Sequence, residues 1–492
     1  MQYLYSNLAI DKTSAIPVYQ QLSNQVIALI KGNQLHGGQK LPGSRQLAEN
    51  LNLHRKTVIR AYDELIAQGW LESRLGSGTY IAEHIPKVEL QQLSRKNTLS
   101  LPDPLSTAGY QLKEFSHLQP QFVPVHSALY LDDGFPDARL APLKDLSRAY
   151  RTQLLLGNPY ARLGYTDPKG SVQLRNELSL YLNETRGLNT TAGNILIVRG
   201  STMGVYLAST ALLGVGDCVA LGESSWSGAR LNFIQAGAKV IPIAVDQYGL
   251  DLDALEQICS KQPLRMVYVT SHHHYPTTVS LRADRRLQLL QLSQKYGFII
   301  FEDDYDFDFH YDNKPILPLA SADAAGMVLY SGSFTKIISP AFRVGYIVGP
   351  ENVINQLNRL RRLVDRQGDT MLENAMAELL QQGIIQRHLR KSLRLYRQRR
   401  DLACQLLSAA LPTQLTFKIP EGGMAIWAQF DPAIDLTLLS QKALKKGLYF
   451  SNGLSHNPAG QTLNSTRLGF ASSTPTELEQ SIAIIKQLIY RK

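Results

Sequence analysis

The sequence predicts an α/β protein in which an N-terminal winged helix-turn-helix precedes a larger domain built around a mainly parallel sheet. Three observations predict this fold class. Apolar residues recur at helical spacing up to about residue 68, two short strand-like runs follow, and beyond residue 128 apolar strands alternate with helical segments. The 492 residues provide enough chain for roughly two to four folded units.

Composition narrows the class of protein. Hydrophobic residues make up 44% of the chain and charged residues 19%, which excludes extensive disorder, a collagen-like repeat and a coiled-coil rod. Lysine and arginine number 51 against 41 acidic residues, and the net charge of +10 favours a polyanionic partner. Cys218, Cys259 and Cys404 lie far apart without a CxxC pair, which excludes a disulfide framework and a thiolate metal site.

The sequence also indicates the compartment. The longest apolar stretch, 205–221, contains Asp217 and two glycines, and the first residues lack the basic-then-apolar pattern of a signal peptide. Unpaired cysteines fit a reducing environment. We therefore expect a soluble, cytoplasmic protein with no membrane partner.

The N-terminal residues predict three helices. Pro17 suits the first turn of a helix that Gly32 ends, and its apolar face is formed by Val18, Leu22, Val26, Ile27, Leu29 and Ile30. Ser44 is the expected N-cap of SRQLAENL, and after the short turn NLHR a third helix runs from about Lys56 to Gln68. The residues of the third helix expected to face inward are Val58, Ala61, Tyr62 and Leu65. So short a turn between two helices is typical of a helix-turn-helix.

A wing and a linker are expected next. The run WLESRLGSGTYIAE predicts two short strands hinged at Gly76-Ser77-Gly78. Residues 84–127 contain five prolines and no sustained period, which is typical of a linker. We therefore expect a winged helix-turn-helix over 1–83, a linker over 84–127 and one further domain over 128–492.

The remaining sequence predicts a parallel sheet covered by helices on both faces. The expected strands are NILIV (194–198), DCVAL (217–221), AKVIPI (238–243), RMVYVT (265–270), GFIIF (297–301) and MVLYSG (327–332). Such sheets place their binding sites at the carboxyl ends of the strands.

Several of these strand ends carry reactive or binding side chains. Lys336 follows MVLYSG, with Ser333 and Arg343 nearby, and a lysine with a lowered pKa in this setting could form a Schiff base with an aldehyde cofactor. The alternative for Lys336 is an exposed surface lysine. GFIIF runs into Glu302, Asp303, Asp304 and Tyr305, which suits pairing with a protonated ring nitrogen and a phenolic oxygen, or else a solvated acidic turn or a cation site.

Other strand ends offer weaker signals. Ser201 and Thr202 begin a helix after NILIV, where an anion would be stabilised, although a plain helix cap explains an isolated turn of this kind better. Trp226 could stack on a flat cofactor or belong to the core. His272, His273 and His274 lack the carboxylate or thiol that would complete a zinc site, so we expect no metal. Arg467, in STRLGFA, could clamp a carboxylate or form a surface ion pair.

Taken in order, these motifs resemble the fold-type-I pyridoxal phosphate enzymes related to aspartate aminotransferase. The segment LPGSRQLAENLNLHRKTVIRAYDELIAQGWLESRLGSGTYI resembles the GntR-type winged helix. The whole chain apart from the linker is therefore similar to the MocR family of bacterial transcription regulators. The resemblance implies a double-stranded DNA operator, pyridoxal 5'-phosphate as cofactor and a head-to-tail homodimer.

The resemblance also implies residue roles. Lys336 would carry the internal aldimine, Asp303 would pair with the pyridine nitrogen, and Tyr305 would contact the phenolic oxygen. Phosphate contacts would come from Ser201, Thr202, Ser333 and Arg343, with Tyr165 reaching the neighbouring subunit's phosphate. Trp226 would stack on the ring, Tyr275 would also contact the cofactor, and Arg467 would receive an effector carboxylate.

Three departures from the family pattern bear on the effector. The family segment SHQFPTG reads SHHHYPTT here, so Thr278 replaces a glycine, and the family's PGY before the stacking position reads SSW. Regulators that sense γ-aminobutyrate carry a second arginine where this chain has Gly228. This weakens a γ-aminobutyrate assignment and leaves pyridoxal phosphate itself, as in the PdxR branch, or another amine or amino acid as effector.

Basic side chains cluster where a recognition helix would meet DNA. Residues 1–87 hold nine basic and six acidic residues. The expected DNA contacts are Arg45, Arg55, Lys56, Thr57, Arg60, Arg74 and Ser77, the alternative being a solvated helical face. A second basic stretch, 359–400, has eleven basic and four acidic residues, and we interpret it as a helix surface held by ion pairs rather than as a second DNA contact.

The leading hypothesis is a dimeric, pyridoxal-phosphate-dependent transcription regulator whose larger domain senses the cofactor or an amine, with vitamin B6 or amine metabolism as the controlled process. The rival hypothesis is a true aminotransferase with a DNA-binding appendage, because all parts of a transaminase site are expected. A plain winged-helix protein with an inactive effector domain is a third reading.

Overall fold

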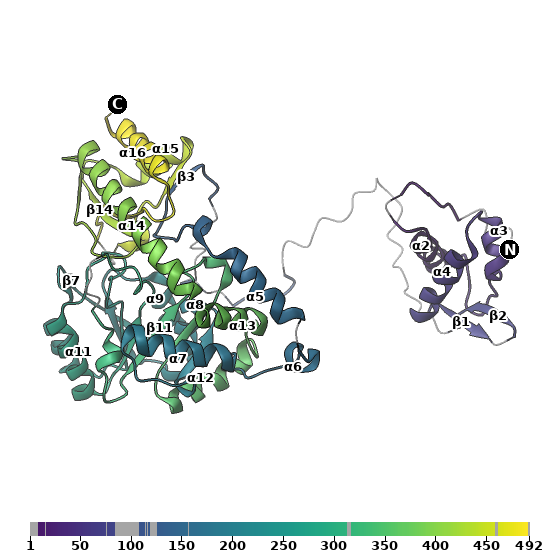
Figure 1. Cartoon of the computed structure of the whole chain (residues 1–492), viewed down its shortest axis with the longest axis horizontal. Coiled ribbons are helices and arrows are strands. Elements are labelled where there is room, and N and C mark those ends of the chain that lie inside the picture. The colour runs from purple at the N-terminus through teal and green to yellow at the C-terminus, as the bar shows by residue number, and fades with distance from the viewer. Residues whose placement is uncertain are drawn as a thin grey trace. The chain divides into compact units, whose positions relative to one another are not determined.

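The chain folds into two units. The computed structural model describes residues 8–14, 16–74, 76–83, 108–113, 115, 117–118, 125–155, 157–311, 316–457 and 461–490. One unit spans residues 1–113 and the other 114–492 (Figure 1). Most of the segment expected to be a linker, 84–127, lies outside the described residues.

The first unit contains three helices around an apolar core. These are α2 (Val18–Lys31), α3 (Ser44–Asn50) and α4 (Arg55–Ala67). α2 ends at Gly32 as predicted, and its Leu22 and Val26 are buried against Val58 and Leu65 of α4. The four residues of α4 predicted to face inward are all buried, so the helical period identified the core of this unit.

One predicted cap is wrong. Gly43, in an extended conformation, is the N-cap of α3, and Ser44 is the first helical residue, with no capping hydrogen bond from a side chain. The carbonyl of Gly43 accepts the amide of Leu47, which makes it the residue that starts the helix. Ser44 Oγ instead lies 3.5 Å from Nε of Arg55, the residue that opens the next helix.

The predicted wing is present. β1 (Leu71–Arg74) pairs antiparallel with β2 (Gly78–Ile81), and the amide of Ser77 donates to the carbonyl of Arg74. Gly76 and Gly78 have φ values of 72° and 117°, which side chains with a Cβ rarely adopt. The two glycines therefore make the tight connection possible.

The second unit contains a seven-stranded sheet in the order β4-β12-β11-β10-β9-β5-β6. All strands are parallel except β12, which runs antiparallel to both neighbours. The strands are β4 (Ile195–Val198), β5 (Cys218–Gly222), β6 (Lys239–Ile243), β9 (Met266–Val269), β10 (Ile299–Asp303), β11 (Val328–Ser333) and β12 (Gly345–Val348). β10 begins two residues later than predicted because Gly297, at φ 74°, ends the preceding helix. The strand also continues through Glu302 and Asp303, beyond its predicted end.

Helices cover both faces of this sheet. Alternate strand residues point to opposite sides: Phe301 packs with α8, α9 and α12, whereas Ile300 packs with α10 and α11. The helices of this unit are α5 (Leu143–Leu155), α6 (Pro159–Leu163), α7 (Val172–Arg186), α8 (Gly200–Leu212), α9 (Ser227–Gln235), α10 (Leu252–Cys259), α11 (Ala283–Tyr296), α12 (Glu351–Val364), α13 (Thr370–Gln381), α14 (Ile384–Ala410), α15 (Leu436–Lys445) and α16 (Pro475–Tyr490). The strands are apolar throughout because both faces are buried.

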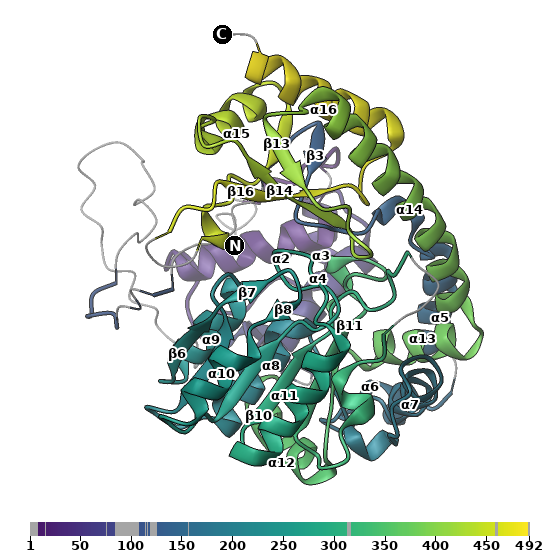
Figure 2. The same cartoon turned by 90° about the vertical axis from the view of Figure 1, so that its left-hand side faces the viewer.

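A smaller part of the same unit packs beside the large sheet. Its antiparallel sheet has the order β13-β14-β16, formed by β13 (Leu415–Phe417), β14 (Ala425–Phe430) and β16 (Ser465–Gly469). β3 (Leu129–Leu131) pairs with β15 (Leu448–Phe450), and a short hairpin is formed by β7 (Val245–Asp246) and β8 (Gly249–Leu250). The long helix α14 runs along both parts (Figure 2), and residues of both parts share one core.

Among the helices of the described segments, none combines the length and apolar character that a bilayer crossing needs.

Candidate functional site

The predicted site residues gather at one edge of the large sheet. Asp303 ends β10, Lys336 follows β11, and Ser201 follows β4. Arg343 precedes β12, which runs antiparallel, so its start lies at the same edge, with Gly345 paired to Ser333. The sheet topology thus brings together residues from segments far apart in the sequence.

Asp303 is buried with one oxygen in use and one free. The hydroxyl of Tyr268 donates to Oδ2 at 2.8 Å, whereas Oδ1 is buried without a hydrogen-bond partner. Burial raises the pKa of Asp303 to about 6, and the hydrogen bond from Tyr268 acts against this rise because it favours the carboxylate. An orphaned carboxylate oxygen in this position is the acceptor that a protonated pyridine nitrogen requires.

The neighbouring acids are occupied by other partners. Glu302 accepts the hydroxyl of Ser271 and the amides of Leu319 and Ala320. Asp304 and Asp306 pair with His272 and His273 at 3.0 and 2.9 Å, and all these side chains are buried. The alternative of a solvated acidic turn is therefore wrong.

The histidine cluster is structural in character. His272 lies between Asp304 and the carbonyl of Ile316, and burial lowers the pKa of His274 to about 4. Within the described segments, no group of three or more histidine, cysteine, aspartate or glutamate side chains is placed to hold a metal ion.

Lys336 points into the protein rather than into solvent. Its Nζ donates to the carbonyl of Gly134 at 2.7 Å and lies 4.2 Å from the centre of the Phe135 ring. Burial lowers the pKa of the Lys336 amine, although Asp133 opposes this shift. A lysine with a lowered pKa has more of the neutral, nucleophilic amine at neutral pH.

Arg467 is also buried, and a carboxylate of the protein itself already faces it. Its Nε lies 2.8 Å from Oδ1 of Asp133, an ion pair without hydrogen-bond alignment, and its Nη1 donates to the carbonyl of Pro276 at 2.9 Å. The guanidinium lies 4.8 Å from the centre of the Tyr275 ring, and the Tyr275 hydroxyl donates to Oδ2 of Asp133 at 2.7 Å. Arg467 therefore forms an ion pair, but a buried one rather than the surface ion pair considered from the sequence, and its role as a clamp for a ligand carboxylate stays a prediction.

The two predicted tyrosines belong to the same cluster. The ring centres of Tyr275 and Tyr305 are 6.4 Å apart, and the Tyr305 hydroxyl donates to the carbonyl of His273 at 3.1 Å. Burial raises the pKa of both hydroxyls, so they remain protonated donors at neutral pH.

A second cluster lies where β4 meets α8. Gly200 has a φ of 76°, and a Cβ on it would come within 2.8 Å of Nη2 of Arg343, which donates to the carbonyl of Arg199. Thr202 and Arg343 line a cavity of about 730 Å³. The N-terminus of α8, its hydroxyls and the guanidinium form a cradle suited to a phosphate. Ser333, predicted to join them, uses its hydroxyl to accept the amide of Thr335 at 3.0 Å.

Trp226 and Thr278, two positions where the sequence departs from the family pattern, also have defined local structures. Trp226 is the N-cap of α9 and is half-buried, and a Cβ on Gly228 would collide with its indole. Thr278 adopts a φ of 64°, the left-handed conformation that favours glycine. The backbone here therefore keeps the conformation that a glycine would adopt freely.

Tyr165 lies apart from this edge of the sheet. Its side chain is exposed, and the guanidinium of Arg366 lies 3.9 Å from its ring centre. Within one chain the structure does not bring Tyr165 to the other site residues.

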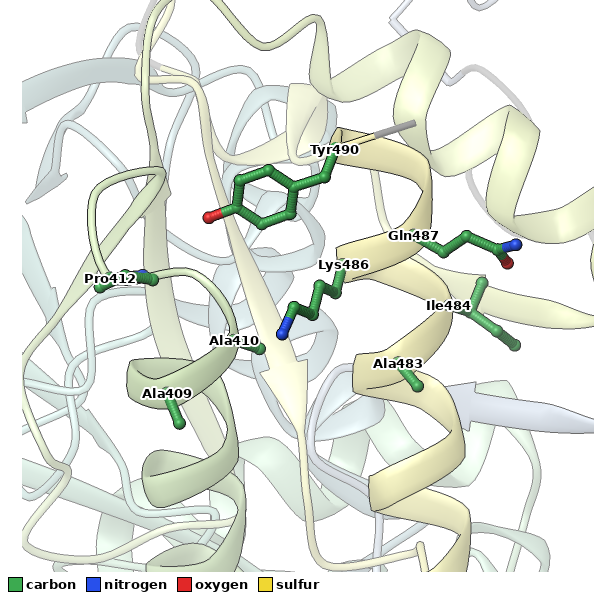
Figure 3. A pocket seen from close by; sticks show the side chains of 8 residues that line it. All are labelled: Ala409, Ala410, Pro412, Ala483, Ile484, Lys486, Gln487 and Tyr490. Atoms are coloured by element: carbon green, nitrogen blue, oxygen red, sulfur yellow. The ribbon is translucent and has the colours of Figure 1, made fainter. Parts of the chain in front are cut away.

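A separate cavity of about 740 Å³ lies between the end of α14 and α16, lined by Ala409, Ala410, Pro412, Ala483, Ile484, Lys486, Gln487 and Tyr490 (Figure 3). None of the predicted site residues lines it. Its single ammonium group, on Lys486, points into the space between the two helices (Figure 3), and the cavity has no other charged group.

In the first unit, the predicted DNA contacts apart from Thr57 are exposed, but some of them are held by neighbouring side chains. Arg45, Arg55 and Lys56 project from α3 and the start of α4. Arg60 stacks 4.0 Å from the ring centre of Tyr19 on α2. Arg74 is held by Glu72 and Glu83 at 2.5 and 2.8 Å, and Thr57 is half-buried. The Ser77 hydroxyl lies 2.6 Å from that of Tyr80.

The second basic stretch is only partly held by ion pairs. Arg361, Arg399 and Arg400 pair with Asp365, Asp137 and Asp401. In contrast, Arg390, Lys391, Arg394 and Arg397 lie exposed at helical spacing along α14 and have no acidic partner among the described residues. The ion-pair interpretation therefore holds for the buried members alone.

Sequence reasoning missed two groups of the site. Tyr268, which holds Asp303, lies inside the strand RMVYVT, where a single tyrosine gives no polar signal. Asp132 and Asp133 follow β3 directly; Asp132 accepts the amides of Gly134 and Phe135, and burial raises its pKa. The paired acids before Gly134 were a usable signal, because a polar pair at the end of a buried strand faces a site.

The two clusters together can bind a flat, phosphorylated, electron-poor ring. A basic amine, a buried carboxylate with a free oxygen, protonated phenols and an anion cradle lie along one edge of the sheet. These residues fit pyridoxal phosphate.

Two family models match the chain: "Aminotransferase class I and II" over residues 133–485, and "Bacterial regulatory proteins, gntR family" over residues 18–81. The chain is 28% identical to the probable rhizopine catabolism regulatory protein MocR of Rhizobium meliloti, over 96% of this chain and 94% of that protein. It is 30% identical to the HTH-type transcriptional regulator YdfD of Bacillus subtilis, over 98% of each.

Solved structures match the larger unit. The chain is similar to a Pyrococcus horikoshii kynurenine aminotransferase, with a TM-score of 0.68 and 25% identity, over 73% of this chain and 90% of that one. An archaeal alanine:glyoxylate aminotransferase gives a TM-score of 0.69 at 25% identity, over 75% and 92%.

Proposed function

Because the chain belongs to the class I and II aminotransferase family and carries a gntR-type DNA-binding domain, it is a MocR-type transcription regulator, and we propose that it senses pyridoxal 5'-phosphate or an amine. The vitamin-derived cofactor would bind the larger unit, and the first unit would read an operator. Such a regulator acts in the cytoplasm and, by its likeness to the family, as a head-to-tail homodimer.

One observation carries this proposal. Asp303 presents a buried, unpartnered carboxylate oxygen at the same sheet edge where Lys336 presents an inward-pointing amine. Leaving a buried carboxylate oxygen unpaired is costly unless a ligand supplies the donor. A pyridine N–H is such a donor, and an aldehyde is the natural partner of the amine.

The residues of the site would each have one task. Lys336 would bind the aldehyde carbon, and Asp303 would hold a proton on the ring nitrogen. Tyr305 and Tyr275, as protonated phenols, would face the ring's phenolic oxygen. The phosphate would be bound by Ser201, Thr202, Ser333 and Arg343, with Tyr165 of a second subunit, and Trp226 would stack on the ring. When bound, the cofactor supplies an aldehyde reactive toward amines and an electron-withdrawing ring.

Sensing would follow from a change at this edge. Arrival of the cofactor, or of an amine beside Lys336, would favour one arrangement of the two units over another and so change operator affinity or spacing. The differential contacts are those of Lys336 and Arg467, because each now bonds to backbone carbonyls that a ligand would replace.

A spectrum tests the proposal. Purified full-length protein is expected to absorb in the visible range, and borohydride should fix the cofactor covalently to the peptide containing Lys336. Lys336→Ala should abolish both signals and alter binding to an operator selected from random-sequence duplexes. Lys442→Ala, at an exposed lysine of α15, is the matched control. Unchanged absorbance and unchanged DNA binding in Lys336→Ala would refute the proposal.

The rival function, a true aminotransferase, is favoured by the presence of both Lys336 and Arg467 in one buried cluster. Under single-turnover conditions with amino acids and 2-oxo acids, an aminotransferase converts its cofactor rapidly to the amine form. Slow or absent conversion, together with ligand-dependent DNA binding, would favour the regulator.

A further inference from the structure

Among the described residues, Arg467 and Lys336 are the two cations close to Tyr275 and Asp133. The guanidinium of Arg467 is not free to bind a ligand carboxylate in the usual way, because its N–H groups already face other atoms of the protein. An arginine binds a carboxylate best through two parallel N–H bonds. Here Nε faces Asp133 at 2.8 Å, and Nη1 donates to the carbonyl of Pro276 at 2.9 Å. Nη2 lies close to Gly134, where a Cβ would approach it to 3.3 Å. Little of the fork is left for a ligand.

Asp133 is fixed in this position. Tyr275 donates to its second oxygen at 2.7 Å, so the carboxylate has a partner on each oxygen. Its side chain is 35% exposed, whereas that of Arg467 is 2% exposed. The carboxylate is therefore the solvent-accessible member of the pair, and the guanidinium is the buried one.

The same loop connects Asp133 to the reactive amine. Lys336 Nζ donates to the carbonyl of Gly134, the residue that follows Asp133. A ligand amine close to Lys336 would thus also lie close to a negative charge, and a ligand carboxylate would meet that charge before it reached Arg467. Such an arrangement rejects one class of ligand as well as attracting another.

We propose that Asp133 is an internal counter-ion of Arg467, and that the effector site therefore prefers primary amines without a carboxylate to α-amino acids. This inference rests on the proposed function for its amine sensing. Asp133 itself is a specificity-determining residue and takes no part in any bond change.

The first test measures how tightly the site binds a carboxylate ligand that has no amine. Cofactor-free full-length protein is titrated calorimetrically with maleate, a dicarboxylate with no amine. Asp133→Asn keeps the size and the hydrogen bond to Tyr275 but removes the charge, and we expect it to bind maleate at least tenfold more tightly than the original protein. Adding Arg467→Gln should abolish that gain. Asp246→Asn is the matched control, because Asp246 pairs with Arg285 at 2.7 Å with similar carboxylate exposure on the β7–β8 hairpin.

The second test compares two ligands that differ only by a carboxylate. In the cofactor-loaded protein, the change in visible absorbance reports binding of 1,4-diaminobutane and of L-ornithine. We expect at least tenfold preference for the diamine, reduced or reversed in Asp133→Asn and unchanged in Asp246→Asn.

Three outcomes would overturn the inference: equal maleate affinity of the original protein and Asp133→Asn, a gain that survives Arg467→Gln, or a preference for ornithine in the original protein. Should Asp133→Asn lose its circular dichroism spectrum, Asp133→Ser removes the same charge with a smaller side chain. A colourless protein after cofactor addition would refute the proposed function, and the maleate titration would still decide the role of Asp133.

Discussion

The two units differ in where they keep their charges. Among its described residues, the first unit buries an apolar core with Ser23 as its buried polar side chain, and its charged groups lie at the surface. The larger unit buries charged side chains such as Arg186, Arg361 and Asp303. Charges that attract a polyanion such as DNA act while exposed to solvent. Charges that orient a small ligand interact with it more strongly when water is excluded from the site.

This difference teaches how the units respond to substitution. A buried charge that loses its partner is left uncompensated in a medium of low dielectric constant. An exposed charge interacts weakly with its neighbours and is screened by salt. Substitutions in the larger unit should therefore act strongly and locally, and those in the first unit weakly and additively.

The largest effect is expected at Arg186. Its guanidinium is buried, pairs with Asp308 at 2.6 Å and lies 4.4 Å from the ring centre of Phe307. Arg186→Met leaves Asp308 without a cation, with the hydroxyl of Tyr181 as its remaining partner, and should lower the free energy of unfolding by about 3–5 kcal/mol. The exposed Arg394, with no acidic partner among the described residues, should lose less than about 0.5 kcal/mol as Arg394→Met. Urea unfolding followed by circular dichroism measures both, and equal losses would contradict the comparison.

A pH effect of similar size is expected at Asp303. Its pKa of about 6 lies above the ordinary value of 3.8, so between pH 4 and 6 the folded, cofactor-free protein binds more protons than the unfolded chain. Stability should therefore fall as pH rises through this window, by up to about 3 kcal/mol. Asp303→Asn should flatten that part of the curve of unfolding free energy against pH. An unchanged slope would show that the carboxyl does not carry this shift.

A smaller, salt-dependent effect is expected in the first unit. Lys56 is exposed at the start of α4, and Lys56→Gln should reduce the slope of log affinity for DNA against log salt by about 1. Arg74→Gln should change the slope less, because Glu72 and Glu83 already hold that guanidinium. Fluorescence anisotropy at several salt concentrations measures both slopes. A larger change for Arg74 would place the wing, rather than α4, at the phosphates.

The smallest effect concerns backbone conformation. Thr278 in the larger unit and Asn33 in the first unit both have positive φ values, 64° and 54°. A β-branched residue is strained there by about 1–2 kcal/mol, whereas asparagine tolerates the conformation. Glycine relieves that strain but adds about 0.5–1 kcal/mol of chain entropy. Thermal unfolding should therefore show Thr278→Gly stabilising by up to about 1 kcal/mol and Asn33→Gly by no more than a few tenths.

The fold could be predicted because its signals are periodic. The inward face of α4 and the apolar strands of the large sheet follow from spacing alone. The start of α3 could not be predicted as well, because Gly43 and Ser44 both suit a cap and only the backbone angles decide between them. The end of a helix or strand depends on one or two residues, whereas its interior is indicated by many apolar residues that follow the same period.

The site was only partly visible in the sequence. Asp303 and Lys336 stand out because each follows a buried strand, and strand ends meet at one edge. The roles of Asp304 and Asp306 could not be assigned, since their partners, His272 and His273, lie more than thirty positions away. The role of Asp133 could not be predicted for the same reason. It depends on the ion pair with Arg467, which belongs to a different sheet and is distant in the sequence.

The indole of Trp226 has a consequence for how this protein could change its ligand over evolutionary time. Because that ring fills the space beside Gly228, an added arginine there has no room until the ring has moved or been replaced. The effect of an exchange at position 228 therefore depends on the residue and rotamer at position 226, so these two positions are expected to change together.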